Sequence, residues 1–120
     1  MISVDAEKAQ VRIYIASNGK SPFAKWFRSM RDTTAQIAIA VRLARVRLGN
    51  FGDSKSVGAG VQELRVGVGA GYRVYFGRDG KAVVILLCGG DKGSQKQDVE
   101  TAKEYWADYR RRKNAEDLKL

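Results

Sequence analysis

The sequence predicts an α+β fold, with helices packed on one face of a small, twisted and mostly antiparallel sheet. Three observations carry this prediction: one isolated strand pattern opens the chain, two helical patterns follow it, and three strand patterns precede a last helix. The 120 residues suit one domain, 1–120, in which 110–120 form a basic and polar C-terminal tail. The expected order is therefore strand, two helices, three strands, helix.

The strands are predicted from apolar residues that alternate with a period of two. In the first of them, Val11, Ile13 and Ile15 alternate with Arg12 and Tyr14, as in a half-buried strand. The predicted strands cover residues 8–16, 61–68, 72–77 and 82–88. The last of these runs is uniformly apolar, which is typical of a central strand.

The first two helices are predicted from their start signals and their apolar spacing. Ser21 suits an N-cap before Pro22 at the first helical position. Thr33 with Gln36 fits a capping box that opens a longer helix over 33–48. The apolar residues that recur at helical spacing in this helix are Ile37, Ala40, Val41, Ala44 and Leu48.

Turn and cap signals divide the rest of the chain. The glycine-rich run 50–60 predicts a loop, and Asp79 followed by Gly80 predicts a hairpin. Ser94 and Gln97 form a second capping-box pattern, so the last helix is expected to begin there.

The chain is strongly basic, with 22 Lys and Arg against 13 Asp and Glu and a net charge of +9. Between residues 8 and 62 there are ten basic and two acidic side chains. The positive electrostatic field of such a surface attracts nucleic acid, an acidic protein partner, or both. The alternative interpretation is that the basic surface serves only solubility.

Several function classes are excluded or disfavoured. The absence of histidine removes Ser-His-Asp and Cys-His triads and two-histidine ribonuclease chemistry, and the lone cysteine removes thiolate metal cages. No metal or cofactor is expected. Cys88 ends an apolar run and is expected to be a buried structural thiol in a reducing compartment. With no signal peptide or membrane-span pattern, we expect a cytoplasmic protein without a membrane partner.

The candidate site is a group of cations on two adjacent strands. If Leu64 and Val74 point into the core, the period of two places Arg65 and Arg73 together on the opposite face. Two guanidinium groups there require a carboxylate or a phosphate as partner. Glu63 shares their face, so an Arg–Glu pair without a further function is the alternative. A phosphate site requires that the two arginines meet in an open, positively charged hollow.

Further cations lie where loops are expected to converge on this site. Lys55 lies in the glycine-rich run, and Lys92 lies just before the last helix, whose N-terminus favours an anion. Three arginines lie on the second predicted helix: Arg42, Arg45 and Arg47. They either contact phosphate or form a solvated helix face, and the sequence does not decide between these two interpretations.

Three stretches resemble the RelE/ParE toxin superfamily, close to its HigB-like branch of phage and addiction-module killer proteins. They are Asn-Phe-Gly-Asp-Ser-Lys-Ser-Val-Gly-Ala-Gly-Val-Gln-Glu-Leu-Arg, Gly-Tyr-Arg-Val-Tyr-Phe and Leu-Leu-Cys-Gly-Gly-Asp-Lys. The resemblance covers residues 23–106. It implies a RelE-like fold and, in a toxin–antitoxin system, an endoribonuclease that cuts mRNA in the ribosomal A site.

The resemblance also implies roles for individual residues. Arg65 matches the arginine that binds the scissile phosphate, and Arg73 matches the arginine of the Gly-Tyr-Arg motif. Lys55 and Lys92 match cationic residues of the neighbouring loops. Gln95 and Lys96 match residues of the last loop less closely. The tyrosine or histidine that several relatives use as general acid or base is replaced here by Asp98 and Val99, so the proton-transfer group is open.

The mechanism expected from these residues is metal-independent attack of the RNA's own 2′-OH on the adjacent phosphate, with arginine and lysine stabilising the transition state. The implied partners are ribosome, mRNA and a cognate antitoxin of the helix-turn-helix type. Two other functions are open at this point: a ParE-like poison of DNA gyrase, and a non-catalytic module that binds RNA or protein.

Overall fold

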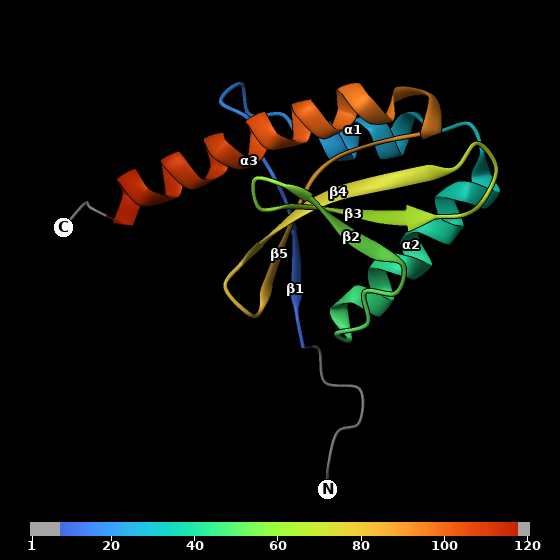
Figure 1. Cartoon of the computed structure of the whole chain (residues 1–120), viewed down its shortest axis with the longest axis horizontal. Coiled ribbons are helices and arrows are strands. Elements are labelled where there is room, and N and C mark those ends of the chain that lie inside the picture. Colours follow the sequence, from blue (N-terminus) through green and yellow to red (C-terminus); the bar gives the residue numbers. More distant parts are fainter. Residues whose placement is uncertain (1–7, 118–120) are drawn as a thin grey trace, which may run out of the picture.

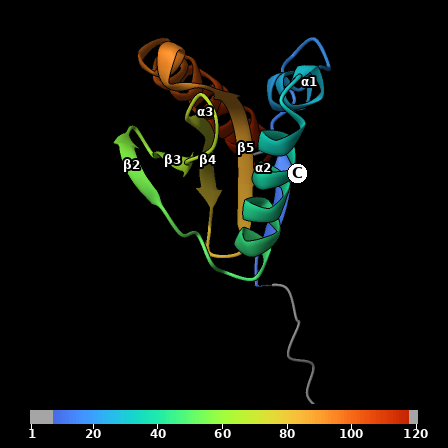
Figure 2. The ribbon, with the colours of Figure 1, turned by 90° about the vertical axis from the view of Figure 1, so that its right-hand side faces the viewer.

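A computed structural model describes residues 8–117 and shows a five-stranded mixed sheet with helices on both of its faces (Figures 1 and 2). The elements are β1 (Gln10–Ile13), α1 (Pro22–Ser29), α2 (Thr33–Arg47), β2 (Ser54–Gly58), β3 (Val61–Val66), β4 (Tyr72–Asp79), β5 (Val83–Gly90), the 3₁₀ helix η1 (Lys92–Ser94) and α3 (Gln95–Asp117). The strand order is β1-β5-β4-β3-β2. Only the β1–β5 pair is parallel within this sheet, so the predicted α+β class and mostly antiparallel sheet are confirmed.

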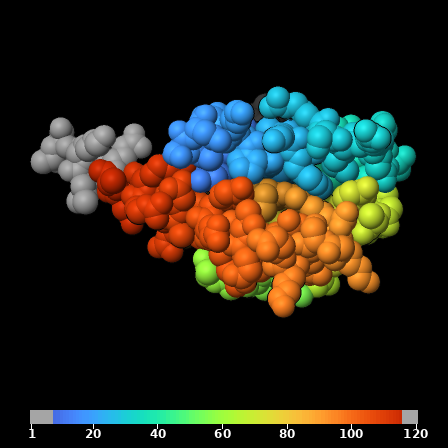
Figure 3. Space-filling view, turned by 90° about the horizontal axis from the view of Figure 1, so that it is seen from above, coloured from blue at the N-terminus to red at the C-terminus, as the bar shows by residue number. Residues whose placement is uncertain are grey.

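The prediction that helices cover one face of the sheet is wrong. One core lies between the sheet and the pair α1 and α2, and a second core lies between the sheet and α3. The reason lies in β4 and β5, whose buried residues point to both faces: Phe76 and Leu86 enter the first core, and Tyr75 and Leu87 enter the second. A sheet that is apolar on both faces needs cover on both. Seen from above, α3 and α1 lie on either side of β5 (Figure 3).

The predicted glycine-rich loop contains an additional strand, β2, which pairs with β3 at the sheet edge. Val57 packs into the second core, while Lys55, two residues earlier on the same face, is exposed. Gly58 and Gly60 have φ of 98° and 83° and form the β2–β3 turn. The glycines therefore mark the turn of a hairpin, whereas the prediction extended the loop over its first strand.

The first strand is shorter than predicted, and only part of its predicted apolar face is buried. Val11 packs against the first core, as predicted. Ile13 and Ile15 are exposed, whereas Tyr14 is buried in the second core. The Tyr14 ring stacks on Tyr105 with 5.0 Å between centroids, and its hydroxyl donates to Asp108. Because α3 covers this side of the edge strand, the tyrosine is buried there and the isoleucines remain open.

The start of α1 agrees with its prediction, and that of α2 does so only in part. Ser21 Oγ accepts from the Ala24 N–H at 3.1 Å, with Pro22 as the first helical residue. At α2 the cap is Asp32, whose carboxylate accepts from the Ala35 N–H at 3.0 Å. The predicted Thr33–Gln36 capping box is therefore wrong, since a carboxylate one residue earlier already satisfies the N–H groups.

The buried face of α2 is formed by Ala35, Ile39, Leu43 and Val46. The other apolar set found at helical spacing is exposed along its whole length: Ile37, Ala40, Val41, Ala44 and Leu48. Since α2 is apolar on two sides, spacing alone does not distinguish the side that faces the sheet.

The last helix begins where predicted, directly after Ser94, and continues further than predicted. Asp91 caps η1 by accepting from the Gly93 and Ser94 N–H groups, and α3 starts at Gln95. Ser94 Oγ donates to Asp98, so the predicted Ser94–Gln97 box is wrong. The expected tail at 110–120 is helical as far as residue 117, and its final turns project beyond the body of the molecule (Figure 3). No helix within 8–117 has the length and apolarity needed to span a membrane.

Candidate functional site

The predicted arginine pair lies at one end of the sheet, where β3 ends and β4 begins. Arg65 and Arg73 are direct partners in the antiparallel register, two residues from the partner pair formed by Glu63 and Tyr75. Directly opposed residues point to the same face of a sheet, and so do residues two apart. The prediction that both arginines and Glu63 share the face opposite Leu64 and Val74 is therefore confirmed.

The carboxylate of Glu63 is at the centre of this group and is fully buried. Its Oε1 accepts from Arg65 Nε at 3.1 Å. Its Oε2 accepts from the Tyr75 hydroxyl at 3.1 Å and from Gln95 Nε2 at 2.9 Å, while Arg73 Nε lies 3.6 Å away. Four side chains from β3, β4 and α3 are thus held by one carboxylate.

The surroundings of Glu63 fix its charge. Burial by itself raises the pKa of a carboxyl group, but hydrogen bonds from Gln95, Arg65 and Tyr75 and the charge of Arg73 outweigh it, so the pKa of Glu63 lies below its usual value. Burial, with the Glu63 charge beside it, raises the pKa of Tyr75 well above its ordinary value. At neutral pH Glu63 is therefore an anion and Tyr75 a neutral donor.

The two arginines differ in how much solvent reaches them. The Arg65 side chain is 37% exposed and that of Arg73 is 12% exposed. Arg73 Nη1 donates to the Gly71 carbonyl at 2.8 Å, and its buried Nε makes no hydrogen bond. The expectation of two guanidinium groups in an open hollow is thus wrong for Arg73, whose side chain lies against Glu63 and the Gly71 carbonyl. Arg65 uses Nε for Glu63 and keeps its two terminal nitrogens without a partner among residues 8–117.

Both predicted lysines lie next to this group. Lys55 is the register partner of Glu63 on β2, so its exposed side chain leaves the same face of the sheet. Lys92 opens η1, and a Cβ built on Gly71 would lie 3.5 Å from Lys92 Cβ and 3.6 Å from Arg73 Nη1. Four cationic residues therefore lie around this end of the sheet, and two of them, Arg65 and Arg73, pair with the buried carboxylate of Glu63. We call this set, formed by Lys55, Glu63, Arg65, Arg73 and Lys92, the cationic cluster.

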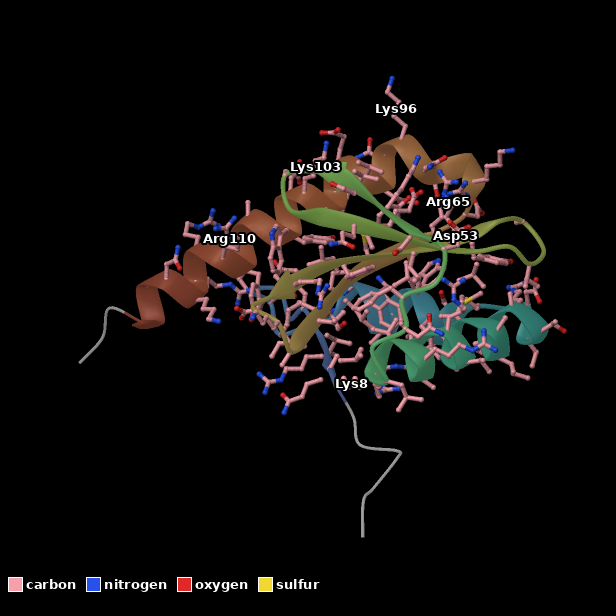
Figure 4. The ribbon with its side chains drawn as sticks, turned by 60° about the horizontal axis from the view of Figure 1, so that its bottom comes forward. Lys8, Asp53, Arg65, Lys96, Lys103 and Arg110 are labelled. Atoms are coloured by element: carbon pink, nitrogen blue, oxygen red, sulfur yellow. The ribbon has the colours of Figure 1, made fainter. Side chains whose placement is uncertain are left out.

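The two α3 residues named from the resemblance behave differently. Gln95 faces inward and donates to Glu63, so it belongs to the support of the cationic cluster. Lys96 is exposed and extends away from α3 (Figure 4). Figure 4 also shows Arg65 on the same side of the molecule as Lys96 and Lys103.

The arginines of α2 lie in the other layer, outside the cationic cluster. Arg42 donates to the backbone carbonyls of Arg65, Phe51 and Asp53, so it ties α2 to the end of β3 and to the chain before β2. Arg45 is exposed, and Arg47 is half-buried near the end of α2. All three therefore belong to the helix on the face of the sheet opposite the Arg65 side chain.

The remaining ionisable groups near the site have structural partners. Asp98 accepts from Ser94 Oγ and lies against Gly90, where an added Cβ would come within 1.8 Å of its carboxylate. Cys88 is buried, and burial raises the pKa of its thiol to about 12, which agrees with the predicted structural thiol. Within residues 8–117 no group of three or more Cys, Asp or Glu residues is placed to hold a metal ion.

Two contributors to the site were not predicted as such. Alternation along β4 places Tyr75 on the face of Arg73, and that pattern is the available signal for its bond to Glu63. Nothing in the sequence near Gln95 indicates that its amide reaches a strand residue 32 positions earlier.

Comparison with known proteins adds a relative but no described activity. No model of a protein family matches the chain. A protein of Haemophilus influenzae, described only as uncharacterized, is 46% identical over 81 residues, which cover 68% of this chain and 82% of that protein. The chain therefore belongs to the same protein family as this uncharacterized Haemophilus influenzae protein.

Proposed function

We propose that the protein is the toxin of a type II toxin–antitoxin system, with a RelE-like fold of the HigB-like branch, and that it cuts mRNA on the ribosome without a metal. The observation that carries this proposal is the convergence of Lys55, Arg65, Arg73 and Lys92 at one end of the sheet. These cations come from the three stretches that resemble the superfamily, although those stretches are separated in sequence.

In the proposed reaction the 2′-oxygen of a nucleotide attacks the adjacent phosphorus. The new bond to phosphorus forms as the bond to the 5′-oxygen breaks, which yields a 2′,3′-cyclic phosphate and a 5′-hydroxyl. Negative charge grows on the two non-bridging oxygens, and Arg65 presents its free terminal nitrogens to them. Lys55 and Lys92 remain the candidates for the proton-transfer groups, and the ribosome supplies most of the positioning.

Glu63 acts in this reaction as a positioning residue. It binds Nε of Arg65 and leaves the outer edge of the guanidinium free, so the plane of the group is fixed before RNA arrives. A preorganised cation of this kind stabilises a transition state more than a mobile one, and loss of one such donor typically slows a reaction about 100- to 1,000-fold.

The proposal is tested with purified protein, a reporter mRNA and a reconstituted translation system. We expect cleavage within the translated frame only while ribosomes move along it, and strong loss of cleavage in Arg65→Ala. Arg12→Ala is the matched control, because Arg12 is an exposed arginine on β1, which β5 and β4 separate from β3 in the sheet. Equal cleavage by both variants, or cleavage of naked RNA at the same rate, contradicts the proposal.

A second candidate, a ParE-like inhibitor of DNA gyrase, is favoured by one specific observation. Glu63 pairs with both arginines, and Arg73 is largely enclosed, as in a cluster that serves the fold. Under that alternative, Arg65→Ala leaves toxicity intact, and the protein converts supercoiled plasmid to linear DNA in the presence of gyrase and ATP.

The partners and location follow from the same proposal. The proposed substrate is mRNA bound to the ribosome in the cytoplasm. The proposed inhibitor is a cognate antitoxin of the helix-turn-helix type. The net charge of +9 supports contact with both polyanionic RNA and an acidic inhibitor.

A further inference from the structure

The outer face of α2 carries a continuous row of apolar side chains that no part of residues 8–117 covers. Ile37 is 61% exposed, Val41 44% and Leu48 49%. The exposed alanines Ala40 and Ala44 lie between them at helical spacing. We call these five residues the α2 stripe.

The α2 stripe is separate from the core side of the helix. The residues of α2 that pack on the sheet are Ile39, Leu43 and Val46 in the first core, together with buried Ala35. Neither fold stability nor solubility requires a second apolar row on the side that faces water. Contiguous exposed apolar surface of this kind is typical of a protein interaction site.

The shape of the α2 stripe suits another helix. Ala40 and Ala44 are one turn apart and small, whereas Ile37 and Leu48 are large and lie toward the two ends. Small residues between larger ones form a shallow groove that admits the side-chain ridge of a second helix. Helix-in-groove recognition uses anchors at this spacing.

The charges beside the α2 stripe select the chemistry of the partner. The helix carries Arg42, Arg45 and Arg47 and no acidic residue. With successive residues about 100° apart around the helix, Arg45 and Arg47 fall on opposite borders of the stripe. A binding helix with acidic residues on both sides of its apolar row meets a cation on either border.

Other occupants fit these observations less well. A second copy of the chain brings the same arginines and a further net charge of +9 to the interface. A membrane surface is disfavoured because the stripe lacks the Trp and Phe side chains that are common on the apolar face of interfacial helices.

We propose that the α2 stripe is the docking surface for an acidic amphipathic helix of a partner protein. This interaction is independent of the cationic cluster, which lies on the opposite face of the sheet. The experiment on the α2 stripe therefore tests this interaction separately from the proposed nuclease activity.

The test uses a panel of synthetic helical peptides with Leu or Ile at every third or fourth position and Glu elsewhere. A scrambled peptide and a Glu-to-Lys peptide serve as controls, and binding is measured by fluorescence anisotropy. The protein variant is Val41→Glu. Ile15→Glu is its matched control, since Ile15 follows β1, lies outside the α2 stripe and is 42% exposed, almost as Val41 is.

We expect wild type and Ile15→Glu to bind the acidic peptides alike, and Val41→Glu to bind at least about tenfold more weakly, as for loss of an interface anchor. The proposal is overturned if no peptide binds wild type or if Val41→Glu binds equally well. Light scattering that shows a dimer dissociated by Val41→Glu assigns the stripe to a second copy. Co-sedimentation with anionic phospholipid vesicles that Val41→Glu abolishes assigns it to a membrane.

Discussion

Replacement of Glu63 by alanine removes the one carboxylate that holds the cationic cluster together. Arg73 is then a largely buried cation without a counter-ion, and the Tyr75 hydroxyl and Gln95 amide lose their acceptor. Loss of one partner of a buried ion pair typically costs about 3–5 kcal/mol. Because the Arg65 side chain is 37% exposed and water reaches it, we expect the lower end, about 3 kcal/mol.

The measurement is urea unfolding followed by the fluorescence of Trp26 and Trp106. Glu100→Ala is the control, because Glu100 pairs with Lys103 on the surface of α3, where such a pair contributes about 0.3–0.5 kcal/mol. If Glu63→Ala lowers the free energy of unfolding by no more than the control does, Glu63 does not organise the cationic cluster, and the positioning role derived for it fails.

Three further predictions concern packing, reactivity and pH. Gly77→Ala should destabilise the fold by about 1–3 kcal/mol in urea unfolding, since the added Cβ would lie 2.4 Å from Trp106, whereas Gly67→Ala, which meets no atom within 4 Å, should cost far less. Cys88, with its pKa raised to about 12 by burial, should react with iodoacetamide at neutral pH only after unfolding in urea; rapid native alkylation contradicts its burial. Because the pKa of Glu63 is lowered on folding, its stabilising contribution is present above the unfolded value of about 4.3 and is lost as pH falls through the folded value. The difference in stability between wild type and Glu63→Ala should therefore shrink on acidification, and a difference that grows refutes the sign.

The site could be predicted to the extent that it depends on strand periodicity. Alternation along β3 and β4 places Glu63, Arg65 and Arg73 on one face, and a short turn makes the two strands neighbours. The solvent exposure of each arginine could not be predicted in this way. It depends on where α3 crosses the sheet and on the bond from Gln95, which are tertiary contacts without a local signal.

The fold was predictable in its class and in most element positions, but not in its layers. The apolar run of β5 is buried on both faces, and periodicity does not say that α3 provides the second cover. In α2 both apolar rows have helical spacing, so the choice of Ile39 and Leu43 over Ile37 and Val41 as the buried row is made by shape complementarity with the sheet. β2 was missed because its glycines are also turn signals.

The central claim is that the exposed guanidinium of Arg65, held by Glu63, binds the phosphate that is cut. It is tested most directly by the single-turnover rate of mRNA cleavage on programmed ribosomes, with wild type and Arg65→Ala at equal folded concentration. We expect the rate to fall about 100- to 1,000-fold at equal folded concentration. Arg65→Ala also removes the hydrogen bond to Glu63 Oε1, so urea unfolding of the same variant is measured to separate the loss of stability from the loss of rate. An unchanged rate, or a wild-type protein that cuts no translated mRNA, contradicts the claim.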